Sequence, residues 1–201
     1  MARTPLSPQA LLDVSRRCAA VIAEKGSAAH TKELVEASGF SERTYFRYFP
    51  TKGECIRPLL DHGDRMFAAE VARRCAGTDG VRAGNLLTLV VDAFVAAYDE
   101  GRLPFDRALL VTILADPPLR RIWLETNDQT ARLLAPSLAR VLGVPDDHID
   151  ALVAADQATL LAVTTVKRMV QTGESAAQAT RIVSESIARQ PISRQLRRDT
   201  P

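Results

Sequence analysis

Apolar residues recur at helical spacing along almost all of this 201-residue chain. Leu11, Val14, Cys18 and Ile22 form one such stripe, with the three- or four-residue steps that place side chains on one face of an α-helix. Runs of β-branched residues bounded by turn residues, which would indicate strands, are missing. The sequence therefore predicts an all-α fold.

Capping and turn residues set the expected helix boundaries. Ser7 before Pro8 signals the start of the first helix, and Gly26 signals its end. Thr51-Lys52-Gly53-Glu54 and Ser175-Ala176-Ala177-Gln178 both read as capping boxes at helix starts. With the remaining signals the sequence predicts about nine helices, over 8–25, 31–38, 42–48, 51–75, 82–100, 104–115, 117–143, 146–173 (capped by Asp146) and 175–189.

The charge is unevenly distributed, although the net formal charge is only +2. Residues 1–53 carry eight Lys or Arg and five Asp or Glu, which leaves eighteen and nineteen for residues 54–201. So small a basic excess permits a nucleic-acid partner without indicating one. Cys18, Cys55 and Cys75 are odd in number and have no C-x-x-C pairing, so neither a disulfide framework nor a zinc site is expected. No metal or cofactor is predicted.

The sequence does not predict a membrane span. No basic segment followed by an apolar one opens the chain, and the charge-free run over 157–166 is far shorter than the ~18 residues that a span requires. A cytoplasmic protein is expected.

Two short helical segments around a glycine turn give the main functional signal. Residues 31–38 are compatible with a helix, Gly39 can adopt a positive φ, and Ser41 can cap a second helix over 42–48. This is the spacing of a helix-turn-helix. A small core with the first helix can be closed by Leu34, Val35, Phe40, Tyr45 and Phe49. The outward side chains, suited to a major groove, would be Glu42, Arg43, Thr44, Arg47 and Tyr48.

Residues 39–52 read Gly-Phe-Ser-Glu-Arg-Thr-Tyr-Phe-Arg-Tyr-Phe-Pro-Thr-Lys. This segment resembles the signature of the TetR family of transcriptional regulators: a glycine turn, a serine cap, a short aromatic recognition helix, then Phe-Pro-Ser/Thr-Lys. The resemblance is strong over residues 8–60 and beyond them extends only to helix number, order and length. It implies an N-terminal three-helix DNA-binding domain over 1–52 and a C-terminal ligand-binding and dimerisation domain over 53–201.

The resemblance also implies which residues contact DNA. It places Lys32 at the start of the second helix, three residues at base-facing positions (Glu42, Arg43 and Thr44), and Tyr48 and Lys52 at phosphate-contacting positions. The full set of expected DNA-binding residues is Thr31, Lys32, Ser41, Glu42, Arg43, Thr44, Tyr45, Arg47, Tyr48 and Lys52.

This chain departs from the family pattern at two places. The family commonly has Leu-Tyr where this chain has Tyr45-Phe46. A phosphate-contacting hydroxyl expected at position 46 is therefore either absent or supplied by Tyr45. His30-Thr31 replaces the usual Thr-Val pair, which leaves the cap of the second helix open.

The expected eighth helix is apolar on nearly every side, with Leu152, Val153, Leu160 and Val163 among its residues. A helix of this kind must be buried all round, which self-association would achieve. With the ninth helix, it would form half of a two-fold four-helix interface, as the resemblance also implies. The alternative is that the eighth helix is central in its own protomer.

A ligand pocket is expected among the fifth to eighth helices, with aromatic walls and a few polar groups. The candidate lining residues are Phe94, Tyr98, Phe105, Trp123, Asn127 and Thr159. For the aromatic residues, ordinary core packing is the favoured explanation of the same spacing. Asp156 would either orient a ligand or pair with an arginine at an interface.

These observations together predict a DNA-binding repressor that a small-molecule ligand releases from a pseudo-palindromic operator. The alternatives are a helical protein-interaction module without DNA binding and, less favoured, an enzyme. The sequence has no G-x-S-x-G, P-loop, G-x-G-x-x-G or H-E-x-x-H motif, and its three histidines are isolated from one another, as surface or capping groups would be.

Overall fold

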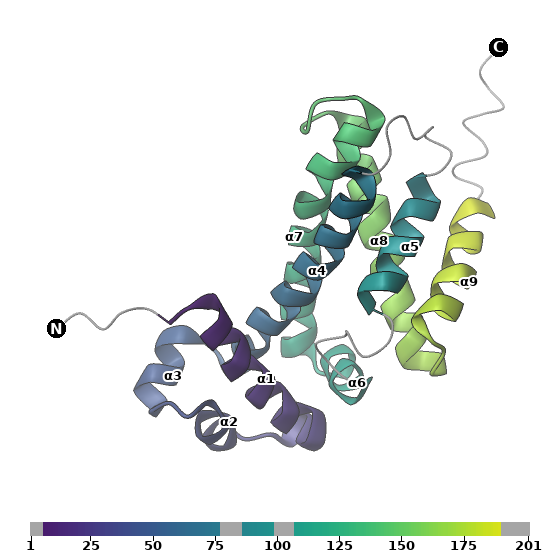
Figure 1. Ribbon diagram of the computed structural model, residues 1–201. Helices are drawn as coiled ribbons and strands as arrows, with labels where there is room; N and C mark the ends of the chain where they lie inside the picture. The colour runs from purple at the N-terminus through teal and green to yellow at the C-terminus, as the bar shows by residue number, and fades with distance from the viewer. Residues whose placement is uncertain (1–5, 77–85, 99–106, 190–201) are drawn as a thin grey trace, which may run out of the picture. The chain divides into compact units, whose positions relative to one another are not determined.

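The computed structural model describes residues 6–76, 86–98 and 107–189. Within these ranges the regular elements are all helices, which confirms the expected all-α class (Figure 1). In order they are α1 (Pro8–Lys25), the 3-10 helix η1 (Gly26–Ala28), α2 (Thr31–Ser38), α3 (Glu42–Tyr48), the 3-10 helix η2 (Lys52–Ile56), α4 (Arg57–Ala76), α5 (Leu86–Tyr98), α6 (Arg107–Ala115), α7 (Pro117–Leu142), α8 (Ile149–Thr172) and α9 (Ala176–Arg189).

Local capping signals placed several helix ends correctly. The Ser7 hydroxyl accepts a hydrogen bond from the Ala10 N–H at 3.2 Å, as an N-cap does. Ser175 and Gln178 form the expected capping box, with reciprocal backbone-to-side-chain bonds of 3.2 Å each. Both expected ends of the helix over 82–100, and the expected start of the helix over 104–115, lie outside the described residues.

The expected capping box at Thr51 is wrong. The Thr51 side chain makes no capping hydrogen bond, residues 52–56 form the tighter turn η2, and α4 begins only at Arg57. The Glu54 carboxylate accepts two bonds from the Arg57 guanidinium instead, at 2.6 and 3.0 Å. A charge-assisted, bidentate pair is stronger than the single bond to a backbone N–H that a capping box requires.

The expected cap of α8 at Asp146 is also wrong, because a turn from Pro145 to His148 delays the helix start. The His148 N–H donates to the Pro145 carbonyl at 3.0 Å. The imidazole of His148 then accepts from the Asp150 N–H at 3.2 Å and caps the helix. This histidine has the capping role that was expected for isolated histidines.

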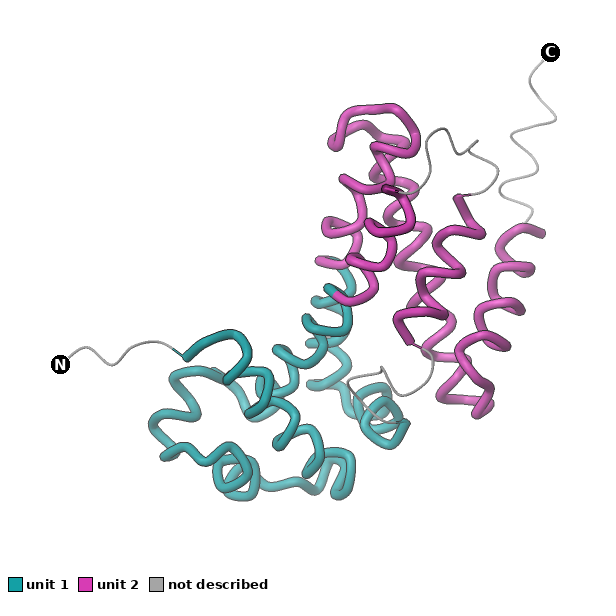
Figure 2. Tube along the Cα trace, viewed as in Figure 1, with its two compact units in different colours: residues 1–65, 103–128 teal, residues 66–102, 129–201 magenta. Residues whose placement is uncertain are grey.

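The described contacts group into two compact units (Figure 2). Unit 1 draws on residues 1–65 and 103–128, and unit 2 on residues 66–102 and 129–201. Both units therefore combine segments that are distant in sequence. The functional division expected at residues 52 and 53 stays a prediction.

In unit 1, α1 packs on α2, η2 and α6, and α2 packs on α3. The side chains at the centre of this packing are almost fully buried: Cys18, Ile22, Leu34, Tyr45 and Phe49. The expected core is confirmed for Leu34, Tyr45 and Phe49, while Val35 and Phe40 are half-buried. This core supports the candidate interface.

In unit 2, α8 packs on α9 and both contact α5. Phe94 stacks on Tyr98 with ring centroids 4.4 Å apart, and Phe67 meets the Phe94 ring edge-on at 5.7 Å. The inward face of α8 carries small side chains such as Ala151 and Ala155. Small residues let neighbouring helices approach closely.

Candidate nucleic-acid interface

The turn between α2 and α3 has the geometry of a helix-turn-helix. Gly39 ends α2 with φ 72°, a left-handed conformation that costs glycine little. Ser41 then caps α3, its hydroxyl accepting from the Thr44 N–H at 3.3 Å. Arg17 of α1 donates to the carbonyls of Ala37 and Ser38 at 2.9 and 3.0 Å. The turn is thus fixed at both ends and tied to α1.

The two faces of α3 differ sharply in exposure. Tyr45 and the following Phe49 are buried in the unit 1 core. The side chains of Glu42, Arg43 and Arg47 are exposed, as expected. Thr44 and Tyr48 are half-buried, and Ser41 is exposed although its hydroxyl serves as the cap.

Tyr45 was expected among the DNA contacts, and the structure places it in the core instead. Its side chain is 0% exposed, and its hydroxyl donates to the Lys52 carbonyl at 3.0 Å. Burial raises the pKa of this hydroxyl, so it stays a neutral donor. The Tyr45 hydroxyl therefore cannot supply the missing phosphate contact.

Phe46 is the residue that the sequence reasoning missed. It is 39% exposed and is the one large apolar side chain that is exposed within the described part of residues 1–65. It lies four residues after Glu42 and three after Arg43, so the three share one face of α3. Helical spacing from those two residues was the signal that could have placed it.

Tyr48 and Arg47 lie at the C-terminal end of α3. The Arg47 guanidinium lies 5.0 Å from the centroid of the Tyr48 ring, a cation–π distance. The Tyr48 hydroxyl accepts from the Leu6 N–H at 3.3 Å, and its ring contacts that of Phe40. Tyr48 is therefore held from two sides, and its hydroxyl proton is free to donate to another acceptor.

At the start of α2, Lys32 is exposed and Thr31 half-buried. The Glu33 carboxylate accepts from the His30 N–H at 2.8 Å and pairs with Lys25 of α1. Hydrogen bonding to Lys25 lowers the pKa of Glu33. The Glu33 carboxylate in the first turn thus binds a backbone N–H at the start of α2, where this chain lacks the usual Thr-Val pair.

Lys52 begins η2, directly after the turn that leaves α3. Its carbonyl accepts both the Tyr45 hydroxyl at 3.0 Å and the Cys55 thiol at 3.3 Å. Its ammonium group is half-exposed and reaches the Ser27 carbonyl at 3.4 Å. The backbone of Lys52 is therefore fixed while its charge remains available to an anion.

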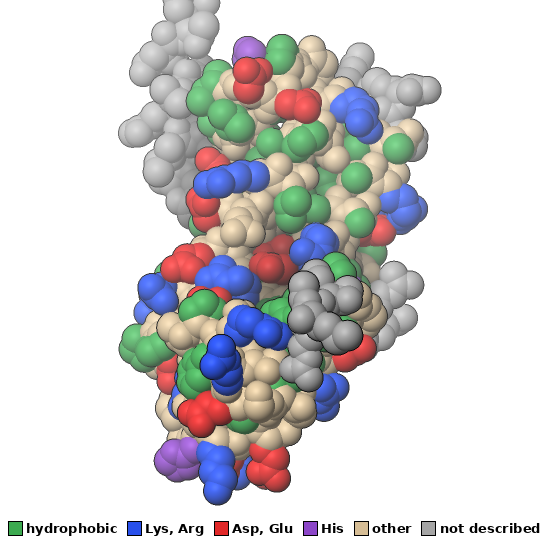
Figure 3. All heavy atoms as spheres, turned by 90° about the vertical axis from the view of Figure 1, so that its left-hand side faces the viewer, with side chains coloured by type: hydrophobic (Ala, Val, Ile, Leu, Met, Phe, Trp, Pro, Cys, Tyr) green, Lys and Arg blue, Asp and Glu red, His purple; other side chains and the backbone are tan. Residues whose placement is uncertain are grey.

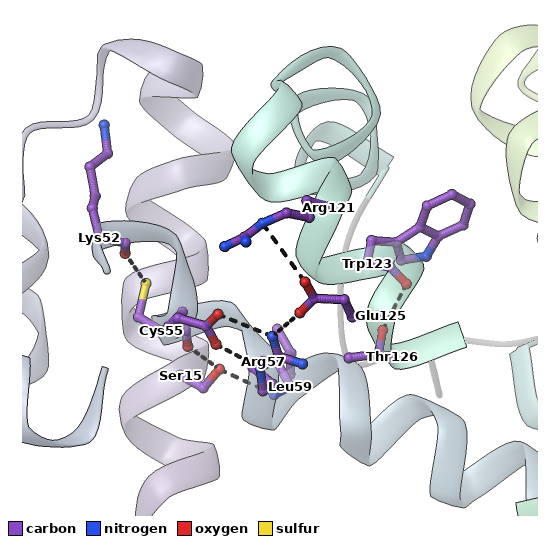
Figure 4. Close-up of polar contacts among 10 residues, drawn as sticks. Ser15, Lys52, Cys55, Arg57, Leu59, Arg121, Trp123, Glu125 and Thr126 are labelled. Atoms are coloured by element: carbon purple, nitrogen blue, oxygen red, sulfur yellow. Dashed lines mark hydrogen bonds and ion pairs between the residues drawn. The ribbon is translucent and has the colours of Figure 1, made fainter. Parts of the chain in front are cut away.

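Figure 4 shows how η2 is anchored on its other sides. The Ser15 hydroxyl of α1 donates to the Cys55 carbonyl at 2.6 Å and accepts from the Leu59 N–H at 3.2 Å. Arg57, already bound to Glu54, also donates to Glu125 of α7 at 2.6 Å. Hydrogen bonding to Arg57 lowers the pKa of Glu125.

On the face drawn in Figure 3, Lys and Arg side chains are interspersed with acidic ones. No single-sign patch dominates this view, in keeping with the small net charge of the sequence. Within the described ranges, no group of three or more His, Cys, Asp or Glu side chains is placed to hold a metal ion.

The expected pocket residues fall in different parts of the fold. Phe94 and Tyr98 stack on one another in unit 2, where Thr159 bonds to the carbonyl four residues before it, at 2.9 Å. Trp123 and Asn127 lie on the part of α7 that belongs to unit 1. Phe105 lies outside the described residues.

The structure was compared with known proteins. No protein-family model matches the sequence, and no curated protein matches it. Among solved structures, a TetR-family transcriptional regulator from Mesorhizobium loti is similar at TM-score 0.56 and 17% identity, covering 92% of this chain and 96% of that one. The transcriptional regulator FadR from Bacillus subtilis, in complex with stearoyl-CoA, matches at TM-score 0.55 and 17% identity, covering 89% and 96%.

A third similar structure is GusR from Salmonella enterica, at TM-score 0.53 and 17% identity, with coverage of 88% and 94%. The chain has the TetR-family fold. The described helices follow the order that the sequence predicted, and α2, the glycine turn and α3 have helix-turn-helix geometry.

Gly53 offers a test of how η2 is packed within this TetR fold. A Cβ atom there would lie 2.9 Å from Leu119 Cδ2 and 3.1 Å from Ile122 Cδ1, both on buried side chains of α7. We expect Gly53→Ala to lower the free energy of unfolding by ~1–3 kcal/mol, because the added methyl overpacks this contact. Denaturant unfolding of the variant measures the loss.

The matched control is the double variant Gly53→Ala with Leu119→Ala. Removing the Leu119 side chain makes room for the new methyl, so the two losses should be less than additive by at least ~0.5 kcal/mol. Strict additivity would mean that Gly53 does not contact α7 in solution.

Proposed function

We propose that this protein is a sequence-specific DNA-binding transcriptional regulator that inserts α3 into the major groove. The observation that carries the proposal is the division of α3 into two faces. One face is locked into the core by Tyr45, and the other presents Glu42, Arg43 and Phe46 to solvent. A short capped helix of this kind, following a glycine turn, suits groove entry by its N-terminal residues.

In this proposal the exposed side chains have separate roles. Arg43 reads a guanine edge and Glu42 accepts from a cytosine amine, the pairings that base-edge chemistry favours. Lys52, Tyr48 and the residues at the start of α2 bind phosphates, which sets register without reading sequence. Selecting bound duplexes from a random DNA pool tests the function as a whole. A protein-interaction module would enrich no sequence.

The phosphate role of Lys52 predicts a specific salt effect. The logarithm of the binding constant falls against the logarithm of salt concentration by ~0.9 for each phosphate neutralised. Lys52→Ala should therefore flatten the slope by about one unit and weaken selected and random duplexes alike. Fluorescence anisotropy over a salt series measures the slope.

Arg189→Ala is the control for this experiment. Arg189 is an exposed basic residue of α9 that pairs with Glu185, outside the proposed interface. It should leave the slope unchanged. A slope unaltered by Lys52→Ala would remove Lys52 from the phosphate contacts.

We also propose that the protein acts as a homodimer through α8 and α9. Large apolar side chains of α8 remain exposed in the single chain: Ile149, Leu152, Val153 and Leu160. Apolar groups collected on one helix mark a surface that associates. Asp156 and Gln157 are exposed on the same helix, which places them beside the proposed interface. A two-fold dimer implies a pseudo-palindromic operator.

By length and composition α8 could also cross a membrane, as the one helix among those described that passes this test. A third of its apolar window is buried inside the fold, where it contacts α9 and α5. The proposed dimer would cover the exposed apolar residues of this helix, and we therefore propose a cytoplasmic location.

The dimer proposal predicts the effect of a charge on α8. Leu160→Glu should dissociate the dimer, because it would bury an unpaired carboxylate in the interface. Leu160 is 57% exposed in the single chain, so the monomer should remain folded. Leu133→Glu on α7, at a residue of 44% exposure, is the control and should stay dimeric. Sedimentation analysis reports both masses, and a dimeric Leu160→Glu would refute this interface.

Finally, we propose that a small molecule controls DNA binding and that the protein is a repressor which the ligand releases. The Asn127 amide nitrogen is buried without a hydrogen-bond partner among the described residues, as is the Thr165 hydroxyl in unit 2. Buried polar groups are rarely left unpaired, so a ligand acceptor near Asn127 would satisfy one of them. One similar structure, FadR, was solved with stearoyl-CoA bound, which makes that compound the first to titrate.

The route from ligand to DNA in this proposal lies within unit 1. Trp123 and Asn127 are on α7, whose Glu125 binds Arg57 next to the turn that carries Lys52. A ligand that favours a different position of α7 would thereby bias the DNA-contacting turn.

Ligand control predicts reciprocal effects on binding. Trp123 is the only tryptophan, so its fluorescence should report ligand titrations. A coupling free energy of ~1–3 kcal/mol corresponds to a change of about 5–150-fold in DNA affinity when ligand binds. A selected duplex must weaken ligand binding by the same factor. A compound with identical affinity in the presence and absence of the duplex is not an effector.

A further inference from the structure

We propose that Phe46 is a sequence-reading residue which contacts the C5 methyl group of a thymine in each half-site. This inference rests on the proposed entry of α3 into the major groove. It assigns a base-specific role to an aromatic side chain at a position where the family resemblance implies a phosphate-contacting hydroxyl.

The placement of Phe46 on α3 supports this role. It follows Arg43 by one helical step of three residues and Glu42 by one of four, so all three side chains emerge on the same face. Both of these neighbours are exposed and charged, whereas Phe46 is apolar and 39% exposed. A groove that receives Glu42 and Arg43 must therefore also receive the Phe46 ring.

The Phe46 ring also contacts a neighbour that is fixed in the core. It meets the Tyr45 ring edge-on, with centroids 5.4 Å apart. Tyr45 itself is immobilised by burial and by its bond to the Lys52 carbonyl. An aromatic group fixed in this way loses little conformational freedom on binding.

The chemistry of the groove identifies the partner. A phenyl ring cannot form hydrogen bonds of the kind that phosphates and the nitrogen and oxygen atoms of base edges make with water. Displacing that water with the ring is therefore unfavourable. The thymine methyl is the one apolar group that the four standard bases present in the major groove. A phenylalanine lacks the hydroxyl that would bind phosphate, so its contribution to binding depends on sequence rather than on the backbone.

The test removes that methyl group and nothing else. Each thymine of a duplex selected from the random pool is replaced in turn by deoxyuridine, which keeps the base-pairing edge and lacks only the C5 methyl. Burial of one methyl contributes ~0.8 kcal/mol, so the wild-type protein should bind about fourfold more weakly at one thymine position per half-site. At that position Phe46→Ala should bind the thymine and deoxyuridine duplexes equally.

Phe46→Leu is the matched variant, because it keeps an apolar side chain and should retain a methyl effect at the same position. Circular dichroism melting checks that both variants fold. The deoxyuridine scan of the wild-type protein is decisive without either variant: a protein that binds its selected duplex but is insensitive to every thymine methyl overturns the inference. A methyl effect that persists in Phe46→Ala overturns it as well.

Failure of the proposed function would look different. A wild-type protein that enriches no sequence from the random pool does not read DNA through α3 at all. A wild-type protein that enriches a sequence and shows no methyl effect dependent on Phe46 is a DNA-binding regulator in which this residue reads nothing.

Discussion

The Ser15 hydroxyl makes the contact on which the geometry of the candidate interface depends. It donates to the carbonyl of Cys55 and accepts from the N–H of Leu59, and it is fully buried. The first N–H groups of a helix need partners from outside that helix. At the start of α4 the Arg57 N–H donates to the Glu54 carbonyl, and Pro58 has no N–H. The next N–H, that of Leu59, donates to the Ser15 hydroxyl. A residue of α1 thereby caps α4 and fixes where the chain leaves η2.

Each residue at the start of η2 then faces a different neighbour. The Lys52 carbonyl receives the Tyr45 hydroxyl from α3, Gly53 allows α7 to approach closely, and Glu54 holds Arg57, which binds Glu125. A side chain larger than hydrogen at residue 53 would force the Leu119 and Ile122 side chains of α7 to shift. The same short turn therefore supports α3 on one side and contacts α7 on the other. The proposed ligand control of DNA binding would act through this turn.

The sequence predicted those parts of the fold that local chemistry decides. The bounds of α2 and α3 follow from Gly39 and Ser41, whose preferences act within a few residues. The capping box at Thr51 failed because Glu54 has a stronger partner in Arg57, an ion pair that Glu125 extends from far along the chain. Arg57 lies only three residues after Glu54, whereas no local pattern reveals the contact with Glu125. Tyr45 was expected both in the core and among the DNA contacts, and its full burial is compatible only with the core position.

The burial of Tyr45 also determines what the outward face of α3 presents. Where the family commonly has Leu-Tyr, the order Tyr45-Phe46 turns the hydroxyl inward and an apolar ring outward. The inward hydroxyl stabilises the turn that carries Lys52, while the outward ring gives up a phosphate bond. Phosphate contacts raise affinity for every sequence, and base contacts raise it for one. In the proposed DNA-binding regulator, Tyr45-Phe46 in place of Leu-Tyr would therefore shift binding energy from the DNA backbone toward sequence.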